Sequence, residues 1–209
     1  MRWAVAGTLD SIKEAINGIN CWNLSGGYHH ASRDSAEGFC IYNDIGIAHK
    51  ELLKSAYLNK NDRILIIDVD AHHGNGNAHT FMDNTNVTIL DIFNDDIYPT
   101  GSFTKKRIDI SVPLHQNTNG AEYLESLKTA LNKIDRSYRI AIVVAGTDVL
   151  SSDPLGGFAL TVEDVVNRDI MIFEKLQKMD IPMVFLSGGG YSKKSVNATS
   201  ESISKLYKL

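Results

Sequence analysis

Residues 63–76 read RILIIDVDAHHGNG, a run of branched apolar side chains that turns into acids, histidines and glycines. The apolar part is typical of a strand that is buried on both faces of a parallel sheet. Asp68, Asp70 and His72 follow at a spacing of two, so at a strand end their side chains share one face. In an open α/β sheet, ligands bind beyond the carboxyl ends of the strands. This stretch therefore predicts a buried strand that ends in half of a metal site.

Along the rest of the chain, apolar segments with strand character alternate with segments of helical periodicity. This alternation predicts a three-layer α/β fold, with a mostly parallel sheet and helices on both faces. Pro113 should place its strand at the edge of the sheet, or end it. Thr161 and Asp164 give a weak capping-box signal for a helix start. We expect strands near residues 21–25, 64–68, 87–91, 107–114, 140–145 and 182–186, and helices near 8–19, 43–58, 77–82, 120–134, 161–179 and 195–206.

Length and composition narrow the class of protein. A chain of 209 residues with 43% apolar side chains suits one domain with a sizeable core. The formal net charge of −4 gives no electrostatic footprint for nucleic acid or for an anionic membrane, so neither is an expected partner. Cys21 and Cys40 lack metal-type spacing and do not make a disulfide framework. No apolar run resembles a signal peptide or a membrane span, and we expect a cytoplasmic protein.

Further metal-binding side chains follow other predicted strands. Asp148 comes after the strand at residues 140–145, in the same strand-to-acid pattern as Asp68. Together with Asp70 and His72 it makes three protein ligands, the number that leaves one position open in a catalytic zinc site. Because two of the three are carboxylates, zinc or ferrous iron is a suitable ion. An ion held in this way polarises a carbonyl group and lowers the pKa of bound water.

Two histidines and a tyrosine add groups that can move protons. His29 and His30 follow a glycine pair and offer a general base and a general acid. Tyr191 follows three glycines and offers a hydroxyl donor to a developing oxyanion. Plainer interpretations exist: a surface histidine pair, a packed aromatic, and Asp70 with His72 merely capping a strand and turn. All these groups follow predicted strands, and this shared position favours a metal-dependent active site over the plainer interpretations.

Five motifs occur in an order and spacing that resemble the zinc-dependent histone deacetylase family. They are GGYHH at 26–30, GFC at 38–40, DVDAHHGNG at 68–76, AGTD at 145–148 and SGGGY at 187–191. The resemblance covers nearly the whole chain. It is strongest to the class IV, histone-deacetylase-11-like branch, because of Gly-Asn-Gly at 74–76 and the LDIFN and IYP segments at 90–99.

The resemblance implies an arginase/deacetylase-like fold and hydrolysis of N-acyl-lysine amides, with an acylated lysine in a protein or peptide as partner. By motif position, Asp70, His72 and Asp148 would bind one Zn²⁺ per chain. His29 and His30 would be the tandem histidines of the family, with His30 as the general base.

The resemblance also assigns supporting roles. Asp68 would orient His29 and help to hold a monovalent cation such as K⁺. Tyr191 would hydrogen-bond the oxyanion of the tetrahedral intermediate. The apolar channel for the acyl-lysine stem would be lined by Gly38, Phe39 and Tyr98.

The sequence departs from the family pattern in two places. Asn75 stands where most members have an aspartate beside the second histidine, as in the class IV branch, and a neutral partner should stabilise a charged His30 less. Family catalytic domains also begin well before the helix expected at residues 8–19. We therefore expect residues 1–209 to form a single, partial catalytic domain that lacks the N-terminal strand or strands and leaves a sheet edge exposed.

Three alternatives to a lysine deacylase stay open. A small acylated amine such as an acetylpolyamine is a possible substrate, because rim loops determine the choice. A two-metal ureohydrolase would need more carboxylates, but Gly74 and Leu150 stand two residues after His72 and Asp148 and cannot coordinate through their side chains. A catalytically silent protein that binds a partner or an acylated peptide is the third alternative.

Overall fold

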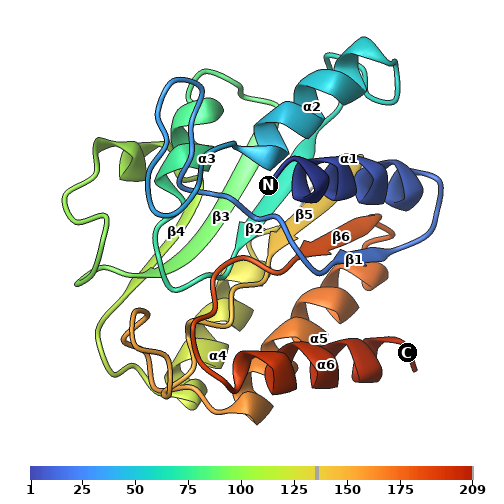
Figure 1. Ribbon diagram of the computed structural model, residues 1–209. Coiled ribbons are helices and arrows are strands. Elements are labelled where there is room, and N and C mark those ends of the chain that lie inside the picture. The colour runs from blue at the N-terminus through green and yellow to red at the C-terminus, as the bar shows by residue number, and fades with distance from the viewer. Residues whose placement is uncertain (135–136, 209) are drawn as a thin grey trace.

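The computed structural model describes residues 1–134 and 137–208. Six parallel strands form one sheet in the order β1-β6-β5-β2-β3-β4 (Figure 1). The strands are β1 (Cys21–Asn23), β2 (Ile64–Asp68), β3 (Val87–Asn94), β4 (Ile110–Leu114), β5 (Ile140–Val144) and β6 (Met183–Leu186). The helices are α1 (Arg2–Ile16), α2 (Asp44–Lys54), α3 (Asn75–Thr80), α4 (Gly120–Leu131), α5 (Val162–Lys178) and α6 (Ser195–Leu206), with a 3-10 helix, η1 (Phe103–Arg107).

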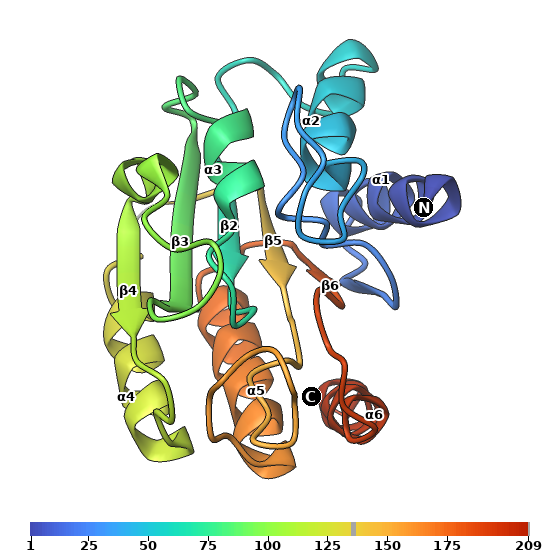
Figure 2. The same cartoon turned by 60° about the vertical axis from the view of Figure 1, so that its left-hand side comes forward.

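The helices cover both faces of the sheet, as Figures 1 and 2 show, so the predicted three-layer α/β fold is confirmed. Alternate residues of β2 serve the two faces. Leu65 and Ile67 pack with side chains of α4, α5 and α6, whereas Ile64 and Ile66 pack with α1 and α2. All four are buried, as the branched apolar run predicts. Within the described residues, no helix combines the length and the apolar character needed to cross a membrane.

The start of the first helix was predicted wrongly. We expected it near Thr8, but α1 begins at Arg2 and ends at Ile16. Thr8 resembles an N-cap in the sequence, yet it lies inside the helix and its hydroxyl donates to Asp44 in α2 at 2.6 Å. The sequence pattern placed the start of this helix too late, because it took Thr8 for an N-cap. The actual partner of the Thr8 hydroxyl is distant in the chain and cannot be recognised from local sequence.

Other boundaries follow the sequence more closely. β4, with Pro113 in it, is an edge strand as predicted, and β1 is the other edge. Thr161 caps α5 through a complete capping box with Asp164. β3 continues to Asn94, three residues beyond the predicted end, because it also pairs with β4 over residues 90–94. The 3-10 helix η1 was not expected.

Candidate active site and metal centre

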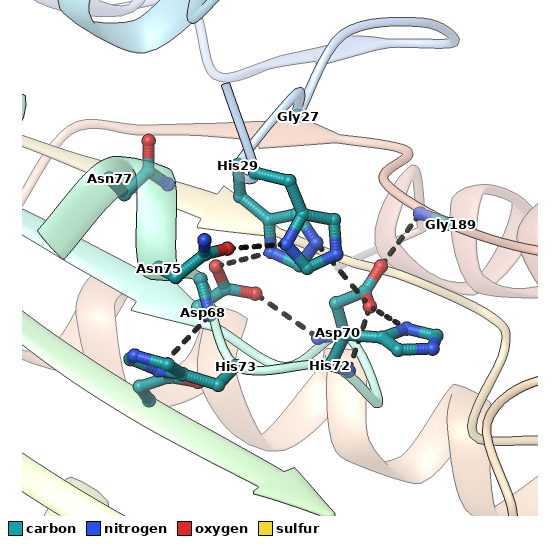
Figure 3. A network of polar contacts seen from close by, with 12 residues as sticks. Gly27, His29, Asp68, Asp70, His72, His73, Asn75, Asn77 and Gly189 are labelled. Atoms are coloured by element: carbon teal, nitrogen blue, oxygen red, sulfur yellow. Dashed lines mark hydrogen bonds and ion pairs between the residues drawn. The ribbon is translucent and has the colours of Figure 1, made fainter. Parts of the chain in front are cut away.

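The predicted site residues meet beyond the carboxyl ends of the central strands. Loops after β1, β2, β5 and β6 carry them, and these four strands are consecutive parallel neighbours in the order β1-β6-β5-β2. Figure 3 shows His29, Asp68, Asp70 and His72 pointing toward one another, with Gly189 reaching the same cluster. The parallel sheet thus brings together groups that lie more than 100 residues apart in the chain, such as the Gly189 amide and the Asp70 carboxylate.

Asp70, His72 and Asp148 each direct a ligand atom to one point. These atoms lie within 4.8 Å of one another, and all three residues are buried. His72 Nδ1 is 3.0 Å from Asp70 Oδ1 and 2.8 Å from Asp148 Oδ2. Backbone amides hold both carboxylates, since Gly189 donates to Asp70 Oδ2 at 2.7 Å and Ala71 donates to Asp148 Oδ1 at 2.9 Å. Two fixed carboxylates and one imidazole fit a zinc-like divalent ion with a further position open.

The electrostatics of these residues also suit a cation. Burial alone would lower the pKa of His72, but its hydrogen bonds with Asp148 and Asp70 raise that pKa to about 10. Burial and the neighbouring Asp70 carboxylate raise the pKa of Asp148 to about 7. Two buried carboxylates side by side therefore favour a positive charge between them.

His29 is held in a strongly acidic setting. Its Nδ1 lies 2.8 Å from Asp68 Oδ2, and its Nε2 lies 3.6 Å from Asp70 Oδ1. Burial alone would lower the pKa of His29, but the Asp68 and Asp70 carboxylates raise it well above the usual value. Burial raises the pKa of Asp68 to about 6, against the opposing effect of His29. His29 is therefore the charged member of the histidine pair.

His30 is in the opposite state. Its Nδ1 lies 2.7 Å from Asn75 Oδ1, and because an amide oxygen only accepts, Nδ1 carries the proton and Nε2 is free to accept another. Burial and the neighbouring His29 lower the pKa of His30 to about 3. Gly38, at φ +55°, packs directly on the His30 ring, where a Cβ would overlap it. His30 is therefore a rigid, neutral base.

A cavity of about 90 Å³ opens beside these groups. Tyr191 lies at it, 45% exposed, and its ring meets that of Phe39 edge-on at 5.9 Å. The Tyr191 amide donates to Asp153 Oδ2 at 2.7 Å, which fixes the loop that carries the tyrosine. Residues around the cavity include His29, His30, Gly38, Phe39, Asp70, His72 and Tyr191.

Tyr98, the third predicted channel residue, lies beside His30. Its ring meets the His30 ring edge-on at 5.1 Å, and its hydroxyl donates to Glu37 Oε2 at 2.7 Å. The described residues that line the 90 Å³ cavity do not include Tyr98. Tyr98 therefore borders the site through His30, and Glu37 becomes an exposed carboxylate near the rim.

Two buried acids in the site had no assigned role in the sequence. Asp44, at the start of α2, accepts the amide protons of Gly27 and Tyr28 at 2.9 and 2.8 Å and so shapes the loop before the histidine pair. Asp91, paired in register with Asp68, binds His73 Nδ1 at 2.6 Å. The other oxygen of Asp91 is buried and has no hydrogen-bond partner among the described residues. An acid at the end of a predicted strand or the start of a predicted helix is the sequence signal that could have found them.

The sequence and the fold are both similar to those of characterised proteins. Residues 1–206 match the model of the histone deacetylase domain family. The chain belongs to the histone deacetylase family. Histone deacetylase 2 of Arabidopsis thaliana is similar at 35% identity over 208 residues, covering 98% of this chain and 53% of the relative. The Staphylococcus aureus acetoin utilization protein AcuC is similar at 34% identity, with 83% and 47% covered.

Solved structures agree with the fold. A histone deacetylase homologue from Aquifex aeolicus is 27% identical with a TM-score of 0.85, covering 98% of this chain and 56% of that one. An acetylpolyamine aminohydrolase from Burkholderia pseudomallei, 24% identical with a TM-score of 0.82, shares the fold over 97% of this chain and 60% of that one. This histone deacetylase family chain thus spans about half the length of the curated relatives it matches.

Proposed function

We propose that the protein hydrolyses N-acyl-lysine amides with one Zn²⁺ held by Asp70, His72 and Asp148. The convergence of three buried ligand atoms beside a neutral histidine base carries this proposal. Bound zinc would supply Lewis-acid polarisation of the acyl carbonyl. Asn75 as the partner of His30 supports placement in the class IV, histone-deacetylase-11-like branch.

The protein's own groups have distinct tasks in this reaction. His30 Nε2 takes a proton from the attacking water as its oxygen bonds to the carbonyl carbon. The Tyr191 hydroxyl donates to the oxyanion that forms. The carbon–nitrogen bond then breaks, and the proton held by His30 passes to the leaving amine. Charged His29, fixed by Asp68, adds positive charge beside the developing negative charge.

We also propose a monovalent cation such as K⁺ near Asp68. Asp68 and Asp91 end adjacent strands, and both are buried. The Asp91 oxygen that has no hydrogen-bond partner among the described residues is a ligand atom of the hard type that such a cation prefers. In this position a cation would offset the buried charge of two neighbouring carboxylates.

A small cationic acylated amine is a second candidate substrate. The observation that favours it is the Glu37 carboxylate, exposed near the rim and fixed by the Tyr98 hydroxyl at 2.7 Å. A carboxylate there attracts a second amino group on a substrate such as an acetylated polyamine.

Metal analysis combined with a paired substrate assay tests the proposal. We expect about one zinc per chain and release of acetate or a fatty acid from an acyl-lysine peptide. Tyr191→Phe should lower kcat by roughly 10²-fold with zinc content unchanged, because it removes one oxyanion donor. Tyr207→Phe, a change at an exposed tyrosine after α6, is the matched control.

Other outcomes identify the alternatives. Full activity of Tyr191→Phe would contradict the proposed role of the tyrosine. Zinc binding without turnover of any acyl-lysine peptide would favour the silent binding protein. Turnover confined to acetylated polyamines, and lost in Glu37→Gln, would favour the small-amine substrate.

A further inference from the structure

A buried arginine lies directly behind the loops that carry the metal ligands. Arg168, in the middle of α5, is fully buried. Its Nη1 donates to two backbone carbonyls, that of Val69 at 3.1 Å and that of Gly146 at 2.6 Å. Burying a charged guanidinium costs desolvation free energy, and its hydrogen bonds to carbonyls of two different loops offset part of that cost.

The two carbonyls belong to the segments that present the ligands. Val69 immediately precedes Asp70, and Gly146 stands two residues before Asp148. β2 and β5 are paired through Asp68 and Val144, and one further bond joins Val69 N to Val144 O at 3.0 Å. Beyond that point Arg168 connects the two segments, together with the Ala71 amide, which donates to Asp148 Oδ1 at 2.9 Å.

Contacts on the other side of the guanidinium hold it in place. Arg168 Nε donates to Asp169 Oδ1 at 2.9 Å, and Nη2 lies 2.9 Å from the same oxygen. The hydroxyl of Ser202, on α6, donates to Asp169 Oδ2 at 2.6 Å. Tyr123 of α4 donates to the Val69 carbonyl at 3.3 Å. Asp169 of α5 and Ser202 of α6 therefore hold the guanidinium, and Tyr123 of α4 binds the same Val69 carbonyl as Arg168 does.

The two ligand carboxylates need to be held close together. Asp70 and Asp148 are buried carboxylates that converge on one point, and each repels the other. Because Asp169 at 2.9 Å balances much of the Arg168 charge, the arginine opposes that repulsion chiefly through its hydrogen bonds to the Val69 and Gly146 carbonyls.

We propose that Arg168 is a positioning residue for the metal centre, setting the separation of Asp70 and Asp148 through the Val69 and Gly146 carbonyls. This inference rests on the proposed metal-dependent function. It requires that loss of the guanidinium weaken metal binding more than it weakens folding.

Cobalt titration of the metal-free protein, followed by visible absorption, tests the inference. Arg168→Met should bind Co²⁺ about 10- to 100-fold more weakly than the wild type, as is typical when a group that orients a ligand is removed. Its cobalt spectrum should also change, because the ligand geometry changes. Titration is carried out at a temperature where circular dichroism shows each variant to be folded.

Arg107→Met is the matched control, because Arg107 also binds backbone carbonyls. Its guanidinium donates to those of Phe81, Asn84 and Val87 at 2.8, 3.0 and 2.5 Å, away from the ligands. This variant should lose stability but keep wild-type Co²⁺ affinity and spectrum.

A second variant keeps the test valid if Arg168→Met does not fold. Asp169→Asn preserves shape but removes the charge that orients Arg168, and it should weaken Co²⁺ binding about 10-fold. Wild-type affinity and spectrum in a folded Arg168→Met or Asp169→Asn would overturn the inference and leave the proposed function intact. Failure of the wild type itself to bind Co²⁺ or Zn²⁺ would instead overturn the proposed function, and this inference with it.

Discussion

At the scale of single residues, two adjacent histidines are driven to opposite protonation states. His29 faces the carboxylates of Asp68 and Asp70, whereas His30 faces the amide of Asn75. The pKa of His29 is raised and that of His30 is lowered to about 3. Environments that push two pKa values apart are how proteins assign acid and base roles to similar side chains.

This contrast leads to a prediction for Asn75→Asp. A carboxylate in place of the amide favours charged His30 and raises its pKa. The base must be neutral to accept a proton, so activity is lost as the pH falls through the pKa of His30. The acid limb of the kcat/KM profile should therefore move to higher pH in the variant. Steady-state assays from about pH 3, the pKa of His30, up to about pH 9 measure the shift.

A remote change of the same kind is the control for that experiment. Asn119→Asp places a new carboxylate at the N-cap of α4, away from the cavity. Its pH profile should match the wild type. An Asn75→Asp profile that also matches would show that His30 is not the base.

At the scale of elements, local capping controls the start of the longest helix. Thr161 accepts from the Asp164 amide at 3.1 Å, and Asp164 Oδ2 accepts from the Thr161 amide at 2.8 Å. Thr161→Ala should lower the free energy of unfolding by about 1 kcal/mol, because it leaves an amide of the first turn without its partner. Urea unfolding measures this change.

The comparison for this prediction is α6, the helix whose Ser202 binds Asp169 of α5. Its N-cap, Lys194, makes no side-chain cap hydrogen bond. Lys194→Ala should therefore change the free energy of unfolding much less than Thr161→Ala. Equal losses in the two variants would show that capping is not the cause.

At the scale of the whole molecule, the metal ligands exist as a set only in the folded protein. Asp148 lies more than 70 residues from Asp70 and His72 in the chain, and the pairing of β2 with β5 brings them together. A divalent ion that binds the folded state should stabilise it by about 2.7 kcal/mol at a free concentration of 100 Kd. Thermal unfolding with Zn²⁺ and with a chelator measures the difference.

The matched variant for this measurement is Asp148→Asn. Its neutral amide removes one anionic ligand, so added Zn²⁺ should no longer raise the Tm. Equal stabilisation of the variant and the wild type would place the ion elsewhere in the molecule.

How far the sequence alone leads depends on whether a feature is local. The apolar run before Asp68 predicted a buried central strand, and Pro113 predicted an edge strand, because periodicity and backbone chemistry act over a few residues. The start of α1 could not be predicted, since Thr8 bonds a side chain 36 residues away. The sequence placed Asp91 at a strand end but could not show that one of its oxygens is buried without a partner in the described part of the chain.

The sequence by itself predicted where the strands lie and which polar residues follow each of them. It also showed which side chains are available to bind a metal and to transfer protons. Only the tertiary structure decided the states of those side chains, because the partners of His29 and His30 come from segments 39 and 45 residues away. It also revealed Arg168, which meets the Val69 carbonyl across 99 residues. Contacts of this kind depend on chain crossovers that bring distant segments together, and no local pattern records them.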